Sequence, residues 1–118
     1  AIDLFTYSPL IKLMDMNDLK FPDNSFHIYY NAFTFRYSPD IKKSIKESIR
    51  VTKNNGYIVV ASTFGYLNEV VPSGAELEEG NKSLIKLYEP YIHSVIWKYE
   101  YWPNEEGGLL NIILKIKK

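Results

Sequence analysis

One stretch of the sequence restricts the fold more than any other: an amphipathic helical pattern followed by an unbroken apolar run. Ile41, Ile45 and Ile49 recur every four residues, and lysines and a glutamate occupy the positions between them. This spacing predicts a helix with one apolar face. Residues 57–63 then read Tyr-Ile-Val-Val-Ala-Ser-Thr, a pattern typical of a strand that is covered on both faces. Together they predict an α/β domain in which this helix lies on a sheet.

Short polar motifs on either side predict where this helix begins and ends. Ser38-Pro39-Asp40 offers a capping hydroxyl, a proline at the first helical position and an acid near the positive end of the helix dipole. Asn54-Asn55-Gly56 offers residues that tolerate a left-handed backbone at a helix end. We therefore expect the helix to start at Ser38 and to stop at Asn54.

The remaining segments predict mainly strands. Aromatic and β-branched residues favour a strand over 26–31, and shorter apolar runs cover 1–5 and 10–14. Residues 92–102 and 109–116 are two long strand-like runs that we expect to form a hairpin around 103–108. Between 64 and 90 we expect one helix with an acidic start at Glu76, Glu78 and Glu79. Its apolar residues are Leu77, Leu84, Leu87 and Tyr88.

The composition narrows the kinds of partner that we expect. A chain of 118 residues forms one domain at most. Its 14 basic residues balance 14 acidic ones, so no positive field for the DNA backbone is expected. No apolar run approaches the roughly 20 residues of a membrane-spanning helix, and there are no cysteines. These features predict a soluble, cytoplasmic domain without a nucleic-acid or membrane partner.

Three motifs occur in a fixed order along the chain. Residues 15–26 read Asp-Met-Asn-Asp-Leu-Lys-Phe-Pro-Asp-Asn-Ser-Phe, and residues 47–51 read Glu-Ser-Ile-Arg-Val at the end of the predicted helix. The hairpin over 92–116 follows. The first motif resembles Asp-x-x-x-Leu-Pro-Phe-x-Asp-x-Ser-Phe-Asp, and the second resembles Glu-x-x-Arg-Val-Leu-Lys-Pro-Gly-Gly, both typical of the class I S-adenosylmethionine-dependent methyltransferases. The hairpin resembles the sixth and seventh strands of that family.

This resemblance implies a single methyltransferase-like domain over residues 1–118, with a Rossmann-like sheet that is mostly parallel and ends in an antiparallel hairpin. The match begins at the family's second strand, at Ile2 and Asp3, so the first strand and its glycine-rich turn have no counterpart. The missing strand is the central one in the family. We therefore expect a fragment or processed chain, whose sheet a preceding segment, a second copy or a partner chain completes.

The resemblance also implies S-adenosylmethionine as the cofactor. Asp3 matches the family's acid that accepts hydrogen bonds from the two ribose hydroxyls, and an ionised carboxylate is suited to that role because it only accepts. Asp15 and Met16 match the pair that recognises adenine. Asn31 and Phe33 follow the fourth strand, where the family holds the methionine end. The alternatives are a turn-capping acid for Asp3 and an ordinary strand-end acid for Asp15.

The acceptor is less well specified than the cofactor. Five side chains near the carboxyl ends of the strands are candidates for the wall of a small-molecule pocket, and ordinary packing is the alternative for most of them: Phe35, Arg36, Tyr37, Phe64 and Tyr66. The family's frequent Glu-His is replaced by Arg36-Tyr37, so no catalytic base is predicted. We expect His27 to be a surface or strand-face residue.

Three functions are consistent with these motifs. The first is methyl transfer to a small molecule, by this chain as part of a larger or truncated domain. The second is a non-catalytic methyltransferase-like module that acts as a partner or scaffold, which the missing glycine turn and the replaced Glu-His motivate. The third is an unrelated α/β domain. The third predicts that the terminal hairpin does not lie beside the strand over 57–63.

Overall fold

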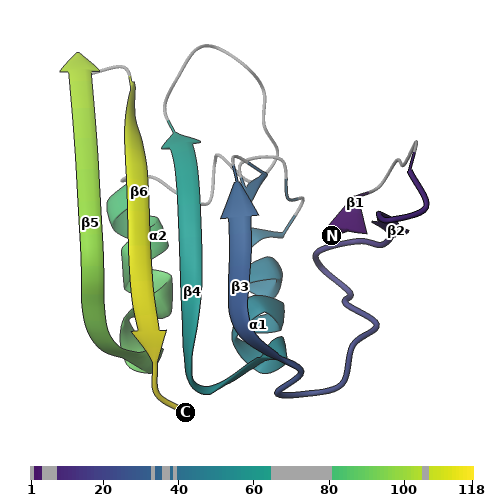
Figure 1. Cartoon of the computed structure of the whole chain (residues 1–118). Coiled ribbons are helices and arrows are strands. Elements are labelled where there is room, and N and C mark those ends of the chain that lie inside the picture. Colours follow the sequence, from purple (N-terminus) through teal and green to yellow (C-terminus); the bar gives the residue numbers. More distant parts are fainter. Residues whose placement is uncertain are drawn as a thin grey trace.

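The computed structural model describes residues 2–3, 8–32, 34, 35, 38, 40–64, 81–104 and 107–118. Strands open and close the described chain, with one strand between its two helices (Figure 1). In order they are β1 (Ile2–Asp3), β2 (Lys12–Leu13), β3 (Phe26–Ala32), α1 (Ile41–Val51), β4 (Thr52–Phe64), α2 (Asn81–Tyr88), the 3-10 turn η3 (Glu89–Tyr91), β5 (Ile92–Asn104) and β6 (Gly107–Ile116).

Four strands form the main sheet in the order β3–β4–β6–β5. β3 runs parallel to β4, whereas β6 is antiparallel to both of its neighbours. β1 and β2 form a separate parallel pair beyond the β3 edge. This arrangement confirms the predicted α/β class with a C-terminal antiparallel hairpin. Because β6 pairs with β4 along Tyr57–Phe64, the hairpin lies beside that strand, contrary to the expectation for an unrelated domain.

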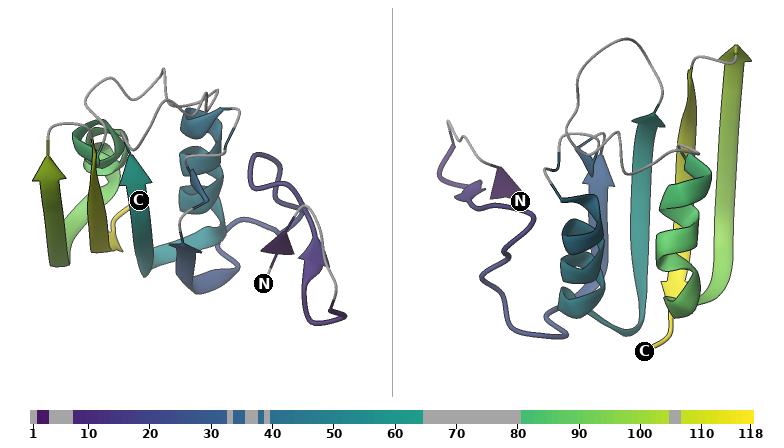
Figure 2. Two further views of the ribbon diagram at one scale, coloured as in Figure 1. Left: turned by 90° about the horizontal axis from the view of Figure 1, so that it is seen from above. Right: turned by 180° about the vertical axis from the view of Figure 1, so that it is seen from behind.

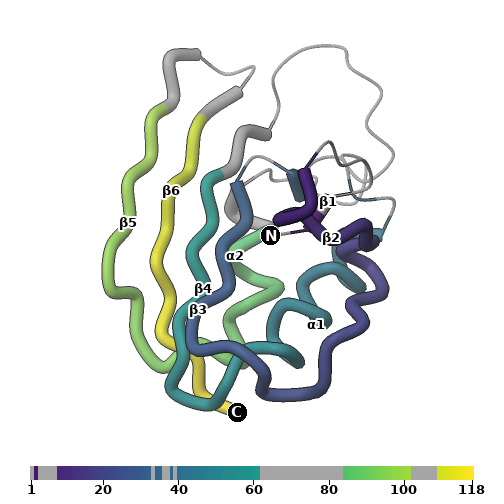
Figure 3. Tube along the Cα trace, turned by 45° about the vertical axis from the view of Figure 1, so that its right-hand side comes forward, coloured from purple at the N-terminus to yellow at the C-terminus, as the bar shows by residue number. Residues whose placement is uncertain are grey.

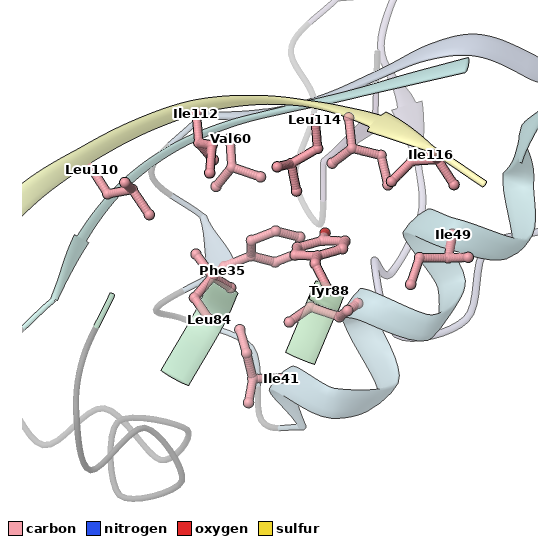
Figure 4. Packing of buried hydrophobic residues seen from close by; sticks show 12 residues of the cluster. Phe35, Ile41, Ile49, Val60, Leu84, Tyr88, Leu110, Ile112, Leu114 and Ile116 are labelled. Carbon is pink, nitrogen blue, oxygen red and sulfur yellow. The ribbon is translucent and has the colours of Figure 1, made fainter. Parts of the chain in front are cut away.

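Both helices pack on the same face of the main sheet (Figure 2). The predicted apolar positions Ile41, Ile45 and Ile49 are all buried there. They meet side chains from alternate positions of the central strands in one cluster, together with Phe35 and α2 (Figure 4). Because side chains alternate across a strand, β6 supplies one row of this core: Leu110, Ile112, Leu114 and Ile116.

The helix begins two residues later than predicted. The N-cap is Asp40, whose carboxylate accepts a hydrogen bond from the Lys43 amide at 3.1 Å. Ser38 is instead fully buried, and its hydroxyl contacts the side chains of Asn17 and Ser44. The stop was also predicted too late. α1 ends at Val51.

Asn54-Asn55-Gly56, the motif that was expected to end the helix, forms a bend inside β4. Pairing with β3 jumps from Phe26–Thr52 to Ile28–Tyr57, so additional residues of β4 are accommodated in a bulge. Asn55 has a positive φ of 64°. A Cβ on Gly56 would lie 2.8 Å from the carbonyl oxygens of His27 and Lys53, so the close approach of these backbones requires glycine.

In the second half of the chain, α2 contains three of the four predicted apolar residues, of which Tyr88 is buried. The fourth, Leu77, lies outside the described residues. Leu84 is buried and Leu87 half-buried. The acidic start predicted for this helix, at Glu76, Glu78 and Glu79, lies outside the described residues. Both hairpin strands form as predicted, with β5 and β6 slightly longer than the apolar runs.

The second face of the main sheet is not covered by any helix that the structure describes. Ile28 and Tyr30 on β3 are 61% and 64% exposed. On β5, Trp97 and Tyr99 stack at 6.3 Å between ring centroids and are also exposed. An uncovered apolar face is unusual for a sheet with parallel strands.

Candidate functional site

The predicted adenine and ribose residues follow two paired strands. Asp3 ends β1 and its backbone is in register with Leu13 at the end of β2. Asp15 follows two residues later. Because β1 and β2 are parallel, both acids lie at the carboxyl edge of this pair, where open α/β sheets bind their ligands. The side chain of Asp3 lies outside the described part of the structure.

A tight turn fixes the carboxylate of Asp15. One of its oxygens accepts a hydrogen bond from the Asn17 amide at 2.8 Å, and its carbonyl accepts from the Asp18 amide at 3.1 Å. The Asp15 side chain remains exposed. Met16 is half-buried and packs against the hydrophobic core. The turn therefore presents an acceptor to solvent while its neighbour anchors it.

Asn31 lies near the carboxyl end of β3 and is buried. Its side-chain oxygen accepts a hydrogen bond from the Thr34 hydroxyl at 2.8 Å. This contact holds the first residues after β3 against the end of the strand. Asn31 thus lies within β3, one residue before its end, instead of following the strand as predicted. Its contact with the methionine end of the cofactor stays a prediction.

A buried polar triangle joins the turn after β2 to the segment after β3. The side-chain oxygen of Asn17 accepts hydrogen bonds from the hydroxyls of Ser38, at 2.9 Å, and Ser44. The two hydroxyls also contact each other at 2.5 Å, and all three side chains are buried. Nothing in the local sequence pattern predicted this triangle, because Asn17 is distant in sequence from both serines.

A second set of contacts ties the chain between β2 and β3 to α1. The trace of that chain runs beside the helix (Figure 3). Every N–H of the Arg50 guanidinium is used. Two go to the Glu47 carboxylate, at 2.8 and 3.0 Å, and two to the carbonyls of Leu19 and Phe21, both at 2.8 Å. The fifth goes to the Asp23 carboxylate at 2.9 Å. The Glu47 carboxylate in turn accepts from the Leu19 amide at 2.8 Å.

The contact with Arg50 changes the pKa of Glu47. The Arg50 guanidinium, with a smaller contribution from the Leu19 amide, lowers the pKa of Glu47 below its usual 4.5, against the opposing effect of burial. Sequence reasoning identified Glu47 and Arg50 only as parts of a motif. Their role in holding residues 19–23 appears only in three dimensions.

The remaining predicted residues fall into two groups. Phe35 is fully buried in the core and stacks on Tyr29, with 6.5 Å between ring centroids, so the packing alternative describes it in this structure. Phe64 ends β4, and its side chain lies outside the described part. The others also lie outside the described residues: Phe33, Arg36, Tyr37 and Tyr66. His27 is exposed, as expected, with Nε2 3.4 Å from the Lys53 ammonium.

Two other kinds of feature are absent from the described residues. They contain no cluster of three or more His, Cys, Asp or Glu side chains arranged to bind a metal ion. None of the described helices is long and apolar enough to cross a membrane.

The chain is similar to known proteins in sequence and in fold. A family described as a methyltransferase domain matches residues 4–60. The ubiquinone/menaquinone biosynthesis C-methyltransferase UbiE of Rickettsia massiliae (strain Mtu5) is 31% identical over 119 residues, which cover 90% of this chain and 45% of the relative. The chain thus spans about half the length of this curated relative.

Solved structures show the same architecture. A SAM-dependent methyltransferase from Aquifex aeolicus superposes with a TM-score of 0.57 at 19% identity, over 88% of this chain and 55% of that one. The N-methyltransferase NodS from Bradyrhizobium japonicum WM9, in complex with S-adenosyl-L-homocysteine, gives 0.66 at 13% identity, over 92% and 54%.

The chain therefore has the fold of the class I S-adenosylmethionine-dependent methyltransferases, in partial form. Within that class, the matched Rickettsia relative is named as a C-methyltransferase of ubiquinone and menaquinone biosynthesis. The comparisons support the cofactor that the sequence predicted.

Proposed function

We propose that this chain forms part of a methyltransferase that transfers a methyl group from S-adenosylmethionine to a small-molecule acceptor. One observation carries the proposal. The buried Asn17–Ser38–Ser44 triangle joins the Asp15–Met16 turn after β2 to the chain that follows β3, to which Asn31 at the end of the strand is bonded through Thr34. Two candidate cofactor segments are thereby held together at the carboxyl ends of parallel strands, where this architecture binds ligands.

The residues of the turn have chemistry that suits the adenine end of the cofactor. The Asp15 carboxylate is exposed and oriented by the Asn17 amide, so it can accept from an exocyclic amine. Met16 can cover the ring edge, while Asp3 accepts from the ribose hydroxyls. When bound, S-adenosylmethionine supplies a methyl group activated by its sulfonium. Positioning of the acceptor in line with that bond then contributes much of the rate.

We propose that the acceptor binds beside the carboxyl ends of β3 and β4, near Arg36, Tyr37, Phe64 and Tyr66. The Rickettsia relative is named for C-methylation in ubiquinone and menaquinone biosynthesis. A quinone precursor methylated on carbon is therefore the first acceptor to test. A base is required only where the acceptor must lose a proton, and we assign none.

We also propose that further chain completes the site. β1 and β2 are separated from the main sheet, the adjacent edge of β3 carries exposed apolar side chains, and one face of the sheet lacks a described helix. A parallel strand between β1 and β3, supplied by preceding residues of a longer chain or by a partner chain, would join the two sheets. It would also place its own carboxyl end between Asp3 and Asn31.

Binding of S-adenosylhomocysteine tests the function. We expect this chain, together with whatever segment completes its sheet (below, the full-length protein), to bind it in isothermal titration calorimetry. Asp15→Ala should weaken the affinity by about tenfold or more, because a hydrogen bond to a charged group contributes about 1.5–3 kcal/mol. The matched control is Asp18→Ala, since Asp18 lies in the same turn but its carboxylate pairs with Lys20 at 2.6 Å. Folded protein that shows no binding at millimolar ligand would contradict the proposal and favour the scaffold alternative.

A further inference from the structure

The two candidate cofactor segments have no covalent link shorter than the whole of β3. Asp15 and Met16 belong to the turn after β2, and Asn31 to the end of β3. Contacts across the fold therefore contribute to their relative position. Within the described residues, the triangle of Asn17, Ser38 and Ser44 joins the turn after β2 to the chain that follows β3.

Each arm of this triangle leads to one part of the candidate site. The Asn17 amide N–H donates to the Asp15 carboxylate at 2.8 Å, so a shift of Asn17 moves the proposed adenine acceptor. The Ser38 amide donates to the Phe35 carbonyl at 3.0 Å, which ties Ser38 to the segment that follows Asn31. Ser44 lies in the first turns of α1 and holds the other two to the helix.

The burial of the triangle makes its hydrogen bonds costly to break. Ser38 and Ser44 are fully buried and Asn17 is 6% exposed. A buried polar group that loses its partner pays its desolvation cost without compensation, so the three groups stay together in the folded protein. Met16, immediately before Asn17, packs against the core and so also helps to hold the turn.

We infer that Asn17, Ser38 and Ser44 are positioning residues for cofactor binding, which set the Asp15 carboxylate relative to the end of β3. This inference rests on the proposed function and adds to it. None of the three is assigned a contact with the cofactor. They act through Asp15, so their loss should affect recognition of the adenosine part of the ligand.

The sequence offers a closely matched pair of variants for the test. Ser44 and Ser48 are both fully buried on α1, one turn apart. Ser48 contacts the Tyr88 hydroxyl at 2.8 Å and donates to the Ile45 carbonyl, so it faces α2 and not the candidate site. Ser44→Ala and Ser48→Ala therefore make the same chemical change at the same burial in the same helix.

We expect Ser44→Ala to weaken binding of S-adenosylhomocysteine and of adenosine by about the same factor, roughly 3- to 10-fold, the value of a typical hydrogen bond. Ser48→Ala should leave both affinities within about twofold of those of the unchanged protein. It should lower the urea midpoint of unfolding by about as much as Ser44→Ala does. Ser38→Ala, which removes the other hydroxyl, should reproduce the effect of Ser44→Ala. Affinities are measured by calorimetry and stability by urea unfolding, both on the full-length protein.

The outcomes separate the two claims. If the unchanged protein binds S-adenosylhomocysteine and Ser44→Ala matches it, or if both serine variants weaken binding equally, the positioning role is wrong and the proposed function stands. If the unchanged, folded protein does not bind the ligand, the proposed function fails and the positioning role fails with it.

Discussion

Arg50 shows why one residue type can be required at a position that touches no ligand. Its guanidinium satisfies two backbone carbonyls and two carboxylates at once. The ammonium of a lysine offers three donors around a single point and cannot span these four partners. The contact therefore depends on the planar geometry of arginine as well as on its charge.

The same contact makes the stability of the protein sensitive to acid. Because the pKa of Glu47 is lowered in the folded state from the usual 4.5, its contribution to stability is complete above that value. The contribution is lost as the pH falls through the lower, folded value. We expect Glu47→Gln to reduce the free energy of unfolding by about 1–3 kcal/mol near pH 7, and the difference to shrink at about pH 3.

Urea unfolding at the two pH values measures this difference. Glu100→Gln is the control, because the Glu100 carboxylate pairs with Lys98 at 3.2 Å on the surface and exposed pairs contribute less than about 1 kcal/mol. A difference between Glu47→Gln and the unchanged protein that stays constant with pH would contradict the explanation.

At the scale of secondary structure, the bend in β4 permits a specific prediction about Gly56. Gly56→Ala would place a methyl group 2.8 Å from two carbonyl oxygens and 2.9 Å from the Thr52 methyl. We expect a loss of about 1–3 kcal/mol in the free energy of unfolding, typical of overpacking, measured by urea denaturation. Asn55→Gly is the neighbouring control, because glycine adopts the positive φ of Asn55 without strain. Equal stability of Gly56→Ala and the unchanged protein would contradict this account.

The same elements show what could be predicted from the sequence. The period of Ile41, Ile45 and Ile49 depends on contacts within one helix face, and it predicted α1 correctly. The boundaries depend on more distant partners. Ser38 is a good capping residue, but its hydroxyl bonds to Asn17 and Asp40 caps the helix instead. Asn54-Asn55-Gly56 favours a helix end locally, but pairing of β4 with β3 makes it a bulge.

The residues of the candidate site also differ in whether a local sequence pattern could predict them. Asp15 and Met16 were found because a motif contains them, whereas Asn17, Glu47 and Arg50 acquire their roles through contacts with residues some 20 to 30 positions away in the sequence. A pattern within a short window has no access to such contacts. Phe35 illustrates a different case, since its place in the chain left a pocket wall and ordinary packing both open and the three-dimensional packing places it in the core.

For the molecule as a whole, the face of the sheet without a described helix distinguishes a partial domain from a completed one. We expect Ile28→Ser to change the free energy of unfolding of this chain by less than about 0.5 kcal/mol, because Ile28 is 61% exposed. In a protein whose further chain also packs on this face of the sheet, the same change should cost about 1.5–3 kcal/mol, the value of burying such a side chain.

Leu114→Ala is the control for this comparison, since Leu114 is buried in the core of this chain and should cost about 2–5 kcal/mol in both proteins. Urea unfolding of each pair supplies the measurement. A small effect of Ile28→Ser in both proteins would show that the added segment lies elsewhere.

The order of strands also bears on how the chain is made. β6 follows β5 in the sequence but lies between β5 and β4 in the sheet. Until residues 107–116 leave the ribosome, β4 has an open edge and β5 has no neighbour, so the sheet cannot grow strand by strand as synthesis proceeds. The core also lacks the row from Leu110 to Ile116 until then. A nascent chain stopped just before β6 would therefore expose the middle of the sheet, the surface on which chaperones act and aggregation begins.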